Sequence, residues 1–487
     1  MNDVRHPDAE DTFIEGPLYA SAKRIYPQRV QGTYRQIKWA LLAFCLAVYY
    51  FLPFLRWDRG PNLPNQAVLL DLENRRFYFF FIEIWPQEAY YFTGLLIIAA
   101  MTLFLLNSIA GRVWCGYLCW QTVWTDLFMA VERHIEGDRR DRIKLDAAPW
   151  SVSKAVKKVS KHFIWLMIAW WTGGAWVLYF SDAPTLVNDL IFFKAPFTAY
   201  MWIGILTFTT YIFAGIMREQ VCLYMCPWPR IQAALTDDKA LNVTYLYDRG
   251  EPRTSVKEAA RLKSAGEAAG DCVDCYQCVN VCPTGVDIRE GSQLGCIQCG
   301  LCIDACDTVM KKLGREPRLI AYDTDEAIQM RLKGETPVYK FFRARTFIYL
   351  ALISMVGGAM IYQLATRMTA GINVIHDRTP LFTPLADGSI RNAYTIRLLN
   401  KRPDVRDFAV TIDGVVNATI EVIGVPATAD WRPVVTVGPD RTREVRVLVS
   451  APRASLTDKS MPIVFRASDL FAGEVVTEDD HFHGPGN

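Results

Sequence analysis

Five uncharged stretches constrain the fold of this chain more than any other feature. Each lacks Asp, Glu, Lys and Arg over a length that can cross the apolar core of a bilayer, which takes about 20 residues within a range of roughly 17 to 25. They cover residues 39–55, 89–111, 162–181, 195–217 and 346–366. Buried core helices are the alternative interpretation, but the aromatic residues at the ends of these stretches are typical of membrane interfaces. We therefore expect an α-helical transmembrane bundle of about five spans.

The composition indicates that this bundle is only part of the protein. The mean hydropathy is +0.10, which is too low for a wholly embedded chain, although 51% of the 487 residues are hydrophobic. This apolar content excludes intrinsic disorder as the main state. The near balance of 53 Lys and Arg against 51 Asp and Glu offers no basic surface for nucleic acid. We expect a multi-domain membrane protein with no nucleic-acid partner.

The distribution of basic residues predicts how the chain is oriented. Lys and Arg gather in the N-terminal tail and between the second and third stretches, whereas residues 182–194 contain one lysine, Lys194. Because short cytoplasmic loops carry the excess of Lys and Arg, the N-terminus is expected in the cytoplasm. The predicted parts are a cytoplasmic tail (1–38), four spans with a C-x3-C motif (39–217), a cytoplasmic segment (218–345), a fifth span (346–366) and an external, periplasmic domain (367–487).

Eight cysteines between the fourth and fifth stretches follow the spacing of a bacterial two-cluster ferredoxin. The run C-x2-C-x2-C-x3-C occurs twice, at Cys272, Cys275, Cys278 and Cys282, and again at Cys296, Cys299, Cys302 and Cys306. This pattern is typical of two [4Fe-4S] clusters, in which the fourth cysteine of each run ligates the other cluster. Structural zinc is the alternative, but it does not require the duplicated eight-cysteine register. We expect an inserted two-cluster ferredoxin-like domain.

Two further cysteine pairs form a short internal repeat. Cys115 and Cys119 follow the second stretch, Cys222 and Cys226 follow the fourth, and both pairs share the pattern Cys-x-Tyr-(Leu or Met)-Cys. A spacing of four would place both sulfurs on one face of a helix. Soft thiolates favour Cu(I) among common metals, while packing of small buried cysteines is the alternative, which we adopt for the isolated Cys45.

The C-terminal part is predicted to be a small β-sandwich. After the fifth stretch the chain shows short alternating apolar runs separated by turn residues such as Asp413-Gly414, which is typical of an immunoglobulin-like fold. It contains no cysteine, and we expect a docking or bracing module. His481 and His483 are expected in a solvated tail, with metal binding as the alternative.

Taken together, these motifs resemble the CcoG/RdxA/FixG family of cytochrome oxidase accessory proteins. The resemblance covers nearly the whole chain and includes the segments 57–62, 76–78, 84–87, 111–117, 121–126, 135–139 and 249–253. Trp120 departs from the family pattern, which has a proline after the second cysteine of the pair, as Pro227 follows Cys226. This departure leaves the sulfurs in place and raises a question about the local backbone.

The resemblance implies an inner-membrane cupric reductase. Members of the family reduce Cu(II) to Cu(I) for the copper centre of a high-affinity haem–copper oxidase, so copper would be a substrate or bound ligand of Cys115, Cys119, Cys222 and Cys226. Membrane lipid, copper chaperones, oxidase subunits and an unidentified electron donor are the implied partners, and a homodimer is left open. Two alternatives stand beside this function: a quinol dehydrogenase of the membrane-ferredoxin type, and a non-catalytic scaffold for oxidase assembly.

Overall fold

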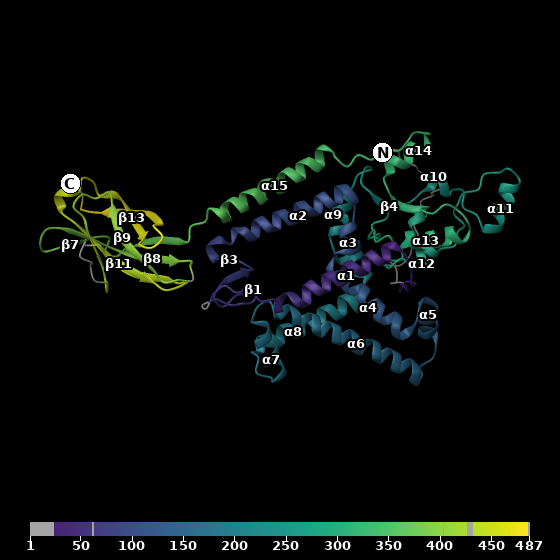
Figure 1. Cartoon of the computed structure of the whole chain (residues 1–487), viewed down its shortest axis with the longest axis horizontal. Helices are drawn as coiled ribbons and strands as arrows, with labels where there is room; N and C mark the ends of the chain where they lie inside the picture. Colours follow the sequence, from purple (N-terminus) through teal and green to yellow (C-terminus); the bar gives the residue numbers. More distant parts are fainter. Residues whose placement is uncertain (1–23, 61–62, 403, 426–431, 486–487) are drawn as a thin grey trace, which may run out of the picture. The chain divides into compact units, whose positions relative to one another are not determined.

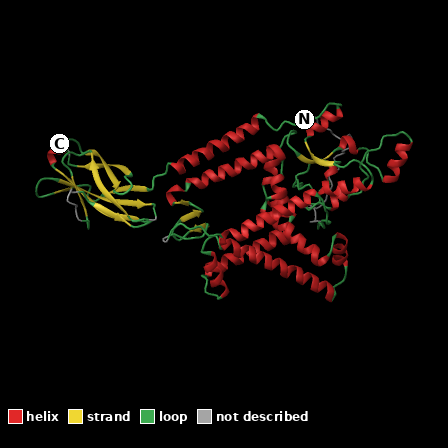
Figure 2. Cartoon of the chain, viewed as in Figure 1, coloured by secondary structure: helices red, strands yellow, loops and turns green. Residues whose placement is uncertain are grey.

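The computed structural model describes residues 24–60, 63–402, 404–425 and 432–485. The first 23 residues of the predicted N-terminal tail (1–38) lie outside the described part of the chain. The structure divides into two compact units, one made of residues 1–53 and 95–354 and the other of residues 54–94 and 355–487. Helices dominate the first unit and strands the second (Figure 2).

Three helices of the first unit share an aromatic core. The helices α1 (Thr33–Phe51), α4 (Trp120–Glu136) and α6 (Val152–Val177) bury Leu42, Phe128 and Trp165 against one another. The stacked rings of Phe128 and Trp165 lie 5.4 Å apart, and the Trp165 indole donates to the carbonyl of Phe128 at 2.9 Å. Burial of such large rings contributes several kcal/mol.

The remaining helices of this bundle are α2 (Tyr90–Ala110), α3 (Val113–Tyr117), α5 (Arg139–Ala147), α7 (Ala183–Ile191), α8 (Phe197–Thr210), the π-helical segments η3 (Tyr211–Met217) and η4 (Val221–Met225), α9 (Trp228–Leu235) and α15 (Ala344–Ala365). Among them, α2, α8 with η3, and α15 follow predicted stretches, whereas α3, α5, α7 and α9 lie between the stretches. The helices α2 and α15 lie side by side (Figure 1), with the rings of Phe104 and Tyr349 6.1 Å apart.

Four helices in the described part of the chain are long and apolar enough to cross a membrane. They are Thr33–Phe54, Tyr90–Ala110, Phe197–Met217 and Ala344–Ala365. Little of their apolar surface is covered by protein, and none of the central window of the last is buried. The third predicted stretch (162–181) begins within α6, which is not among these four, so the count of five spans stays a prediction.

The cysteine-rich segment forms a small domain within the first unit. Its strands β4 (Asn242–Tyr245) and β5 (Ile320–Asp323) pair antiparallel, with Val243 opposite Tyr322. The helices are α10 (Tyr247–Gly250), α11 (Val256–Ser264), α12 (Gln277–Asn280), α13 (Leu301–Lys312) and α14 (Asp325–Leu332). Its core combines apolar residues such as Ile303 and Leu319 with the cysteines themselves.

The second unit contains a β-sandwich and a small three-stranded sheet. One face of the sandwich has the strand order β10-β12-β8-β6, with β7 also paired to β8, and the other has β11-β9-β13-β14. The strands are β6 (Ala370–His376), β7 (Thr383–Pro384), β8 (Ile390–Asn400), β9 (Arg406–Asp413), β10 (Thr419–Val422), β11 (Val434–Val437), β12 (Thr442–Ala451), β13 (Ser460–Asp469) and β14 (Val475–His483). Every second residue of β8 is buried, as expected for a strand with one face in the core.

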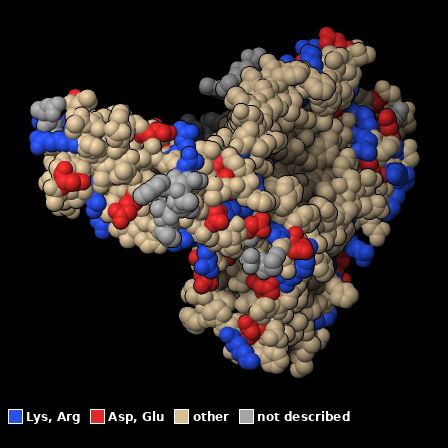
Figure 3. Space-filling model, turned by 60° about the vertical axis from the view of Figure 1, so that its left-hand side comes forward, with Lys and Arg blue, Asp and Glu red and all other residues tan. Residues whose placement is uncertain are grey.

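The small sheet consists of β1 (Val68–Asp71), β2 (Arg76–Phe79) and β3 (Ile82–Ile84). It contacts the sandwich through ion pairs: Arg76 pairs with Asp440, and Lys401 lies 2.9 Å from Glu88, which follows β3. On the face shown in Figure 3, charged side chains gather in groups and leave broad areas of other residues between them.

The expectation of a tail at His481 and His483 is wrong, although the His481 side chain is exposed to solvent as expected. Both residues belong to β14, the last strand of one sheet. The carbonyl of His481 accepts a hydrogen bond from the buried Tyr394 hydroxyl at 2.9 Å, and the His483 ring lies 5.0 Å from that of His376. Edge pairing with β13 orders this segment because an extended strand satisfies its backbone groups by joining the sheet.

Candidate metal centres

The two cysteine runs fold into loops with the same backbone conformation. Asp274 and Tyr276 of the first run have positive φ of 56° and 55°, and the corresponding Gln298 and Gly300 of the second have 56° and 72°. Left-handed residues are rare outside glycine, so their recurrence at matching places marks a functional constraint. Alternating right- and left-handed residues turn successive N–H groups into a concave nest that suits anions and iron–sulfur sites. The residues present therefore fit an anionic [4Fe-4S] cluster in each loop.

The neighbours of each thiol agree with the crossed arrangement, in which the fourth cysteine of each run ligates the cluster of the other run. Burial, together with the nearby thiols of Cys278, Cys272 and Cys275, raises the pKa of Cys306 to about 12. Burial likewise raises the pKa of Cys296 to about 12, with Cys299 and Cys282 adding to the shift. Cys306 thus faces the first run, and Cys282 faces the second.

The thiols of the two runs also lie next to each other. Burial raises the pKa of Cys302 well above its usual value, and its thiol neighbours include Cys299 and Cys296 of its own run and Cys282 and Cys278 of the first. Cys275 of the first run is exposed, whereas Cys299 at the corresponding place in the second run is buried, so the two loops differ in solvent access, which tunes the potential of a bound cluster. The ligand roles of all eight cysteines remain predictions that this packing suits.

The two C-x3-C pairs have similar backbone conformations. In neither pair do the two cysteines lie on one face of a continuous helix. The N–H of Cys119 bonds to the carbonyl of Trp114 at 3.0 Å, and that of Cys226 to the carbonyl of Val221 at 2.8 Å. Both are bonds across five residues, and both cysteines are extended, with ψ of 129° at Cys119 and 123° at Cys226.

The expectation of two sulfurs on one side of a continuous helix is therefore wrong. The second cysteine of each pair leaves the helix because an extended residue cannot continue it, and at Cys226 the following proline enforces this conformation. Cys119 adopts the same conformation although Trp120 follows it. The departure at Trp120 thus leaves the local backbone unchanged.

The four thiols of these pairs lie close together. Burial raises the pKa of Cys115 to about 12, and Cys119, Cys222 and Cys226 all contribute to its shift. Burial also raises the pKa of Cys222 to about 12. In the described residues, no group of three or more His, Cys, Asp or Glu converges tightly enough to hold a metal ion. The raised pKa values of Cys115 and Cys222 favour their protonated forms, and a cation bound beside them would favour the thiolates.

The second cysteine run packs directly against both C-x3-C pairs. Gly116 has no room for a side chain, since a Cβ there would stand 2.8 Å from the carbonyl oxygen of Ile297 and 3.1 Å from the Cα of Cys299. A Cβ on Gly295 would stand 3.1 Å from a methyl carbon of Leu223. The Tyr117 hydroxyl donates to the carbonyl of Cys299 at 3.0 Å. Close backbone approach thus places the quartet beside the second cluster loop.

Arg112 is a functional residue that the sequence analysis named only as part of a motif. It is 7% exposed, and its guanidinium donates to the carbonyls of Leu294 at 2.5 Å, Cys296 at 3.3 Å and Pro229 at 2.7 Å. Its backbone N–H donates to the Gln298 side chain at 2.7 Å. Burial lowers the pKa of Arg112, while Cys115 and Cys296 raise it. One cation thus lies beside both thiol groups.

A second residue outside the predicted set fixes the cysteine domain to α1. Asp304, between Cys302 and Cys306, accepts hydrogen bonds from the backbone N–H of Tyr34 at 3.2 Å and of Arg35 at 2.8 Å. This carboxylate caps the N-terminus of α1 from another part of the chain, where free N–H groups favour an anion. No sequence signal marks such a long-range cap.

Family models match three segments of the chain. Residues 217–325 match a 4Fe-4S dicluster domain, residues 92–136 match a 4Fe-4S binding domain, and residues 360–485 match the IG-like fold at the C-terminus of FixG. The first match contains the eight cysteines of the two runs. The second contains Cys115 and Cys119.

Curated relatives match almost the whole chain. The nitrogen fixation protein FixG of Rhizobium meliloti is 48% identical over 97% of this chain and 95% of its own length. The proteins RdxB and RdxA of Cereibacter sphaeroides are each 48% identical, over 96% and 90% of this chain and 98% and 92% of their own lengths.

Proposed function

Because this chain belongs to the FixG/RdxA family, an iron–sulfur oxidoreductase family by its domains, we propose that it reduces Cu(II) to Cu(I) at the quartet Cys115, Cys119, Cys222 and Cys226. A [4Fe-4S] cluster, when bound, supplies single electrons at low reorganisation cost. One electron converts one Cu(II) to one Cu(I), and thiolates retain the softer reduced ion. The copper centre of a high-affinity haem–copper cytochrome c oxidase is the proposed destination.

The contact of the second cysteine run with both C-x3-C pairs supports this proposal most directly. Gly116 lies against the backbone of that run, and Gly295, just before the run, lies against the side chain of Leu223 between Cys222 and Cys226. A donor and an acceptor of electrons are thereby held in fixed register by backbone packing. The quartet is also partly exposed, with all four cysteines between buried and open, so an ion can reach it.

The proposed location is the bacterial inner membrane, with the N-terminus and the cysteine domain in the cytoplasm and the C-terminal domain in the periplasm. The division of the structure supports this topology. The segment between the first two stretches packs with the C-terminal sandwich, as in the pair Lys401–Glu88, and the charge rule places both outside. The sandwich is then available to copper chaperones and oxidase subunits in the periplasm.

The test uses the full-length protein with its clusters reduced chemically under anaerobic conditions. Addition of Cu(II) should reoxidise the clusters, restoring their visible absorbance, and should produce one Cu(I) for each electron transferred, measured with a Cu(I)-specific chelator. Replacing all four quartet cysteines with serine should abolish copper binding and slow this reaction, while Cys45→Ser should change neither. Equal rates of cluster reoxidation in the quartet variant and the parent protein would contradict the proposal.

The match of residues 92–136 to a 4Fe-4S binding domain favours a second candidate for the quartet, which is an iron–sulfur site of its own. Iron analysis separates the two candidates. Iron in excess of two clusters that is lost in the quartet variant would indicate a further cluster, whereas unchanged iron with lost copper would indicate the copper site.

A further inference from the structure

A large cavity lies apart from the cysteine quartet, between the start of α1, helix α4 and the cysteine domain. It has a volume of about 710 Å³, which is within the range of small-molecule sites. Trp39 and Met129 supply apolar wall, together with Pro283, which follows Cys282, and Leu301, which precedes Cys302. The copper proposal makes no use of this space.

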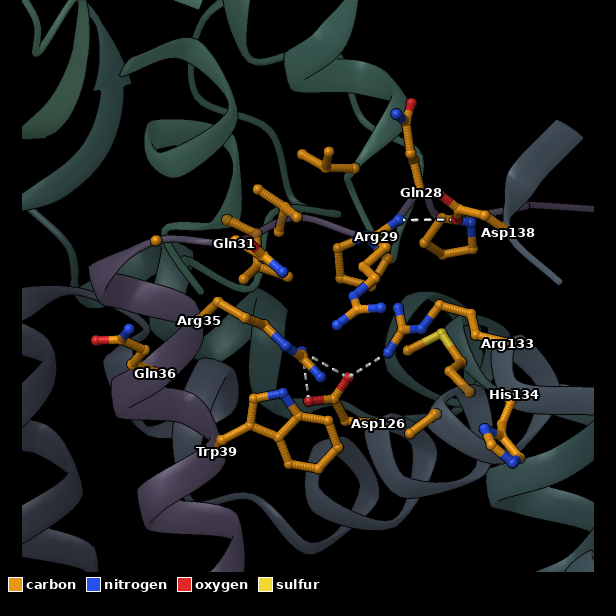
Figure 4. A pocket seen from close by; sticks show the side chains of 18 residues that line it. Gln28, Arg29, Gln31, Arg35, Gln36, Trp39, Asp126, Arg133, His134 and Asp138 are labelled. Atoms are coloured by element: carbon orange, nitrogen blue, oxygen red, sulfur yellow. Dashed lines mark hydrogen bonds and ion pairs between the residues drawn. The ribbon is translucent and has the colours of Figure 1, made fainter. Parts of the chain in front are cut away.

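Positive charge dominates the wall of this cavity. Figure 4 shows the guanidinium groups of Arg29, Arg35 and Arg133 directed toward a common space above Asp126. Arg35 donates to both oxygens of Asp126 at 2.9 and 2.8 Å, and Arg133 lies 3.9 Å from the same carboxylate. Lys38, which is 2% exposed, lies 3.8 Å from it as well. Three cations thus share one carboxylate.

Other titratable groups around the cavity do not balance this excess. Asp138 accepts the backbone N–H of Arg29 at 2.9 Å, and His134 also lines the wall. The carboxylate of Asp304 accepts hydrogen bonds from the backbone N–H groups of Tyr34 and Arg35 at the start of α1. The four cations Arg29, Arg35, Lys38 and Arg133 thus face three carboxylates, those of Asp126, Asp138 and Asp304. An anion in the cavity would balance the remaining positive charge.

One polar atom of a residue that lines the cavity lacks a hydrogen-bond partner. Arg35 is 7% exposed, and its Nη2 is buried without a hydrogen-bond partner in the described structure. A buried donor without a partner costs roughly 1 to 3 kcal/mol, so a native site retains one where a ligand satisfies it. The same guanidinium lies 4.4 Å from the Trp39 ring, which holds it in place.

We propose that this cavity binds a phosphate-bearing ligand, with the phosphate between Arg29, Arg35 and Arg133 and an apolar or aromatic part against Trp39. Planar guanidinium forks match the oxygens of a phosphate group. A soluble phosphate monoester such as a flavin mononucleotide and the headgroup of an anionic lipid share this chemistry. Pro283 and Leu301, each next to a cluster-loop cysteine, line the site, and none of the four quartet cysteines does.

The test uses the full-length protein in phosphatidylcholine nanodiscs with flavin mononucleotide as the soluble probe. Quenching of flavin fluorescence reports binding, and inorganic phosphate should compete. Arg29→Gln, at an exposed position, and Arg133→Gln should each raise Kd about tenfold, since charge-assisted hydrogen bonds are worth that much. Arg140→Gln on the neighbouring α5 is exposed and outside the cavity, and it should leave Kd unchanged.

A parallel arm tests the lipid source. Protein is reconstituted with phosphatidylglycerol, and retained lipid is measured by native mass spectrometry. Retention of phosphatidylglycerol that Arg29→Gln lowers and Arg140→Gln does not would support a headgroup site, just as the flavin result would support a soluble ligand. Binding of neither probe, or equal loss in Arg29→Gln and Arg140→Gln, would overturn the proposal.

Discussion

Gly116 lies against the backbone of Cys299, so closely that a Cβ on the glycine would stand 3.1 Å from both the Cα and the nitrogen of the cysteine. The two residues belong to the first C-x3-C segment and the second cysteine run. Since neither partner atom belongs to a flexible side chain, any added methyl group must push the two segments apart.

Gly116→Ala should therefore slow electron transfer from the reduced clusters to Cu(II) without removing a cysteine. The expected loss is on the order of tenfold to a hundredfold, because a displacement of about 1 Å between reacting groups can cost that much. Rapid-mixing absorbance measures the rate. Gly174→Ala is the matched control, since nothing lies within 4 Å of its Cβ; a similar loss there would contradict the proposed role of the contact.

The crossed arrangement, in which Cys306 ligates the cluster of the first run and Cys282 that of the second, gives a spectroscopic prediction. Cys306 neighbours Cys278, Cys272 and Cys275, so Cys306→Ser should alter the same electron paramagnetic resonance signal as Cys275→Ser. Cys282→Ser should instead reproduce the effect of Cys299→Ser. If Cys306→Ser altered the same signal as Cys299→Ser, each run would ligate its own cluster and the crossed arrangement would be contradicted.

Local sequence patterns predict much of this architecture. The charge-free stretches place α2, α8 with η3, and α15 within a few residues of their observed ends, since apolarity over 20 residues is a local property. The cysteine spacing likewise predicts which thiols can surround a cluster, because short loops can wrap one cubane only in a few ways.

The contacts between distant segments could not be predicted in the same way. Asp126, Glu132 and Glu136 give α4 the sequence of an exposed charged helix, yet each is about 1% exposed. Their partners come from elsewhere in the chain, as with Arg35 for Asp126 and Arg218 for Glu132. Pairing across such sequence separations is a tertiary property that periodicity does not contain.

Arg112 should raise the reduction potential of the second cluster. Its charge lies beside Cys296 and Cys115, and a positive charge favours the reduced, more anionic state. Arg112→Gln should lower that potential by roughly 70 mV, as a unit charge at about 10 Å contributes on the order of 1.7 kcal/mol at an effective dielectric constant near 20.

Redox titration followed by electron paramagnetic resonance measures both clusters in one sample. Arg112→Lys keeps the charge and should restore most of the shift, although it loses the fork that binds three carbonyls. A shift of equal size in both clusters would indicate a general structural effect and contradict the assigned role of Arg112.

Arg406 should be essential to the stability of the sandwich. Its side chain is 3% exposed and lies 2.9 Å from Glu474, while its Nε donates to the fully buried Asp469 at 2.9 Å. Arg406→Met should destabilise this domain by about 3 to 5 kcal/mol because it leaves two carboxylates without their cation. Arg397→Met removes an exposed pair with Glu444 and should cost at most about 1 kcal/mol. Hydrogen exchange of β8 and β13 in the full-length protein measures both.

Glu132 should make the helical unit sensitive to acid. Burial alone would raise its pKa, but the charge of Arg218, a hydrogen bond from Arg218, and the charges of Lys161 and Arg142 together lower it from 4.5 to about 2. A carboxyl whose pKa is lower in the folded state adds stability at pH values above its unfolded pKa and loses it as pH falls through the folded value.

The stabilisation by Glu132 should thus be complete above about pH 5 and disappear between about pH 4.5 and 2, amounting to about 3 kcal/mol at 1.36 kcal/mol per pKa unit. Glu132→Gln should lower the thermal midpoint of the helical signal at pH 7 and flatten its fall below pH 4.5. Four cations then lack this counter-charge, those of Arg24, Arg142, Lys161 and Arg218. Glu267→Gln, at an exposed position, should preserve the acid profile of the parent protein. An unchanged acid profile in Glu132→Gln would show that other carboxylates carry the acid response.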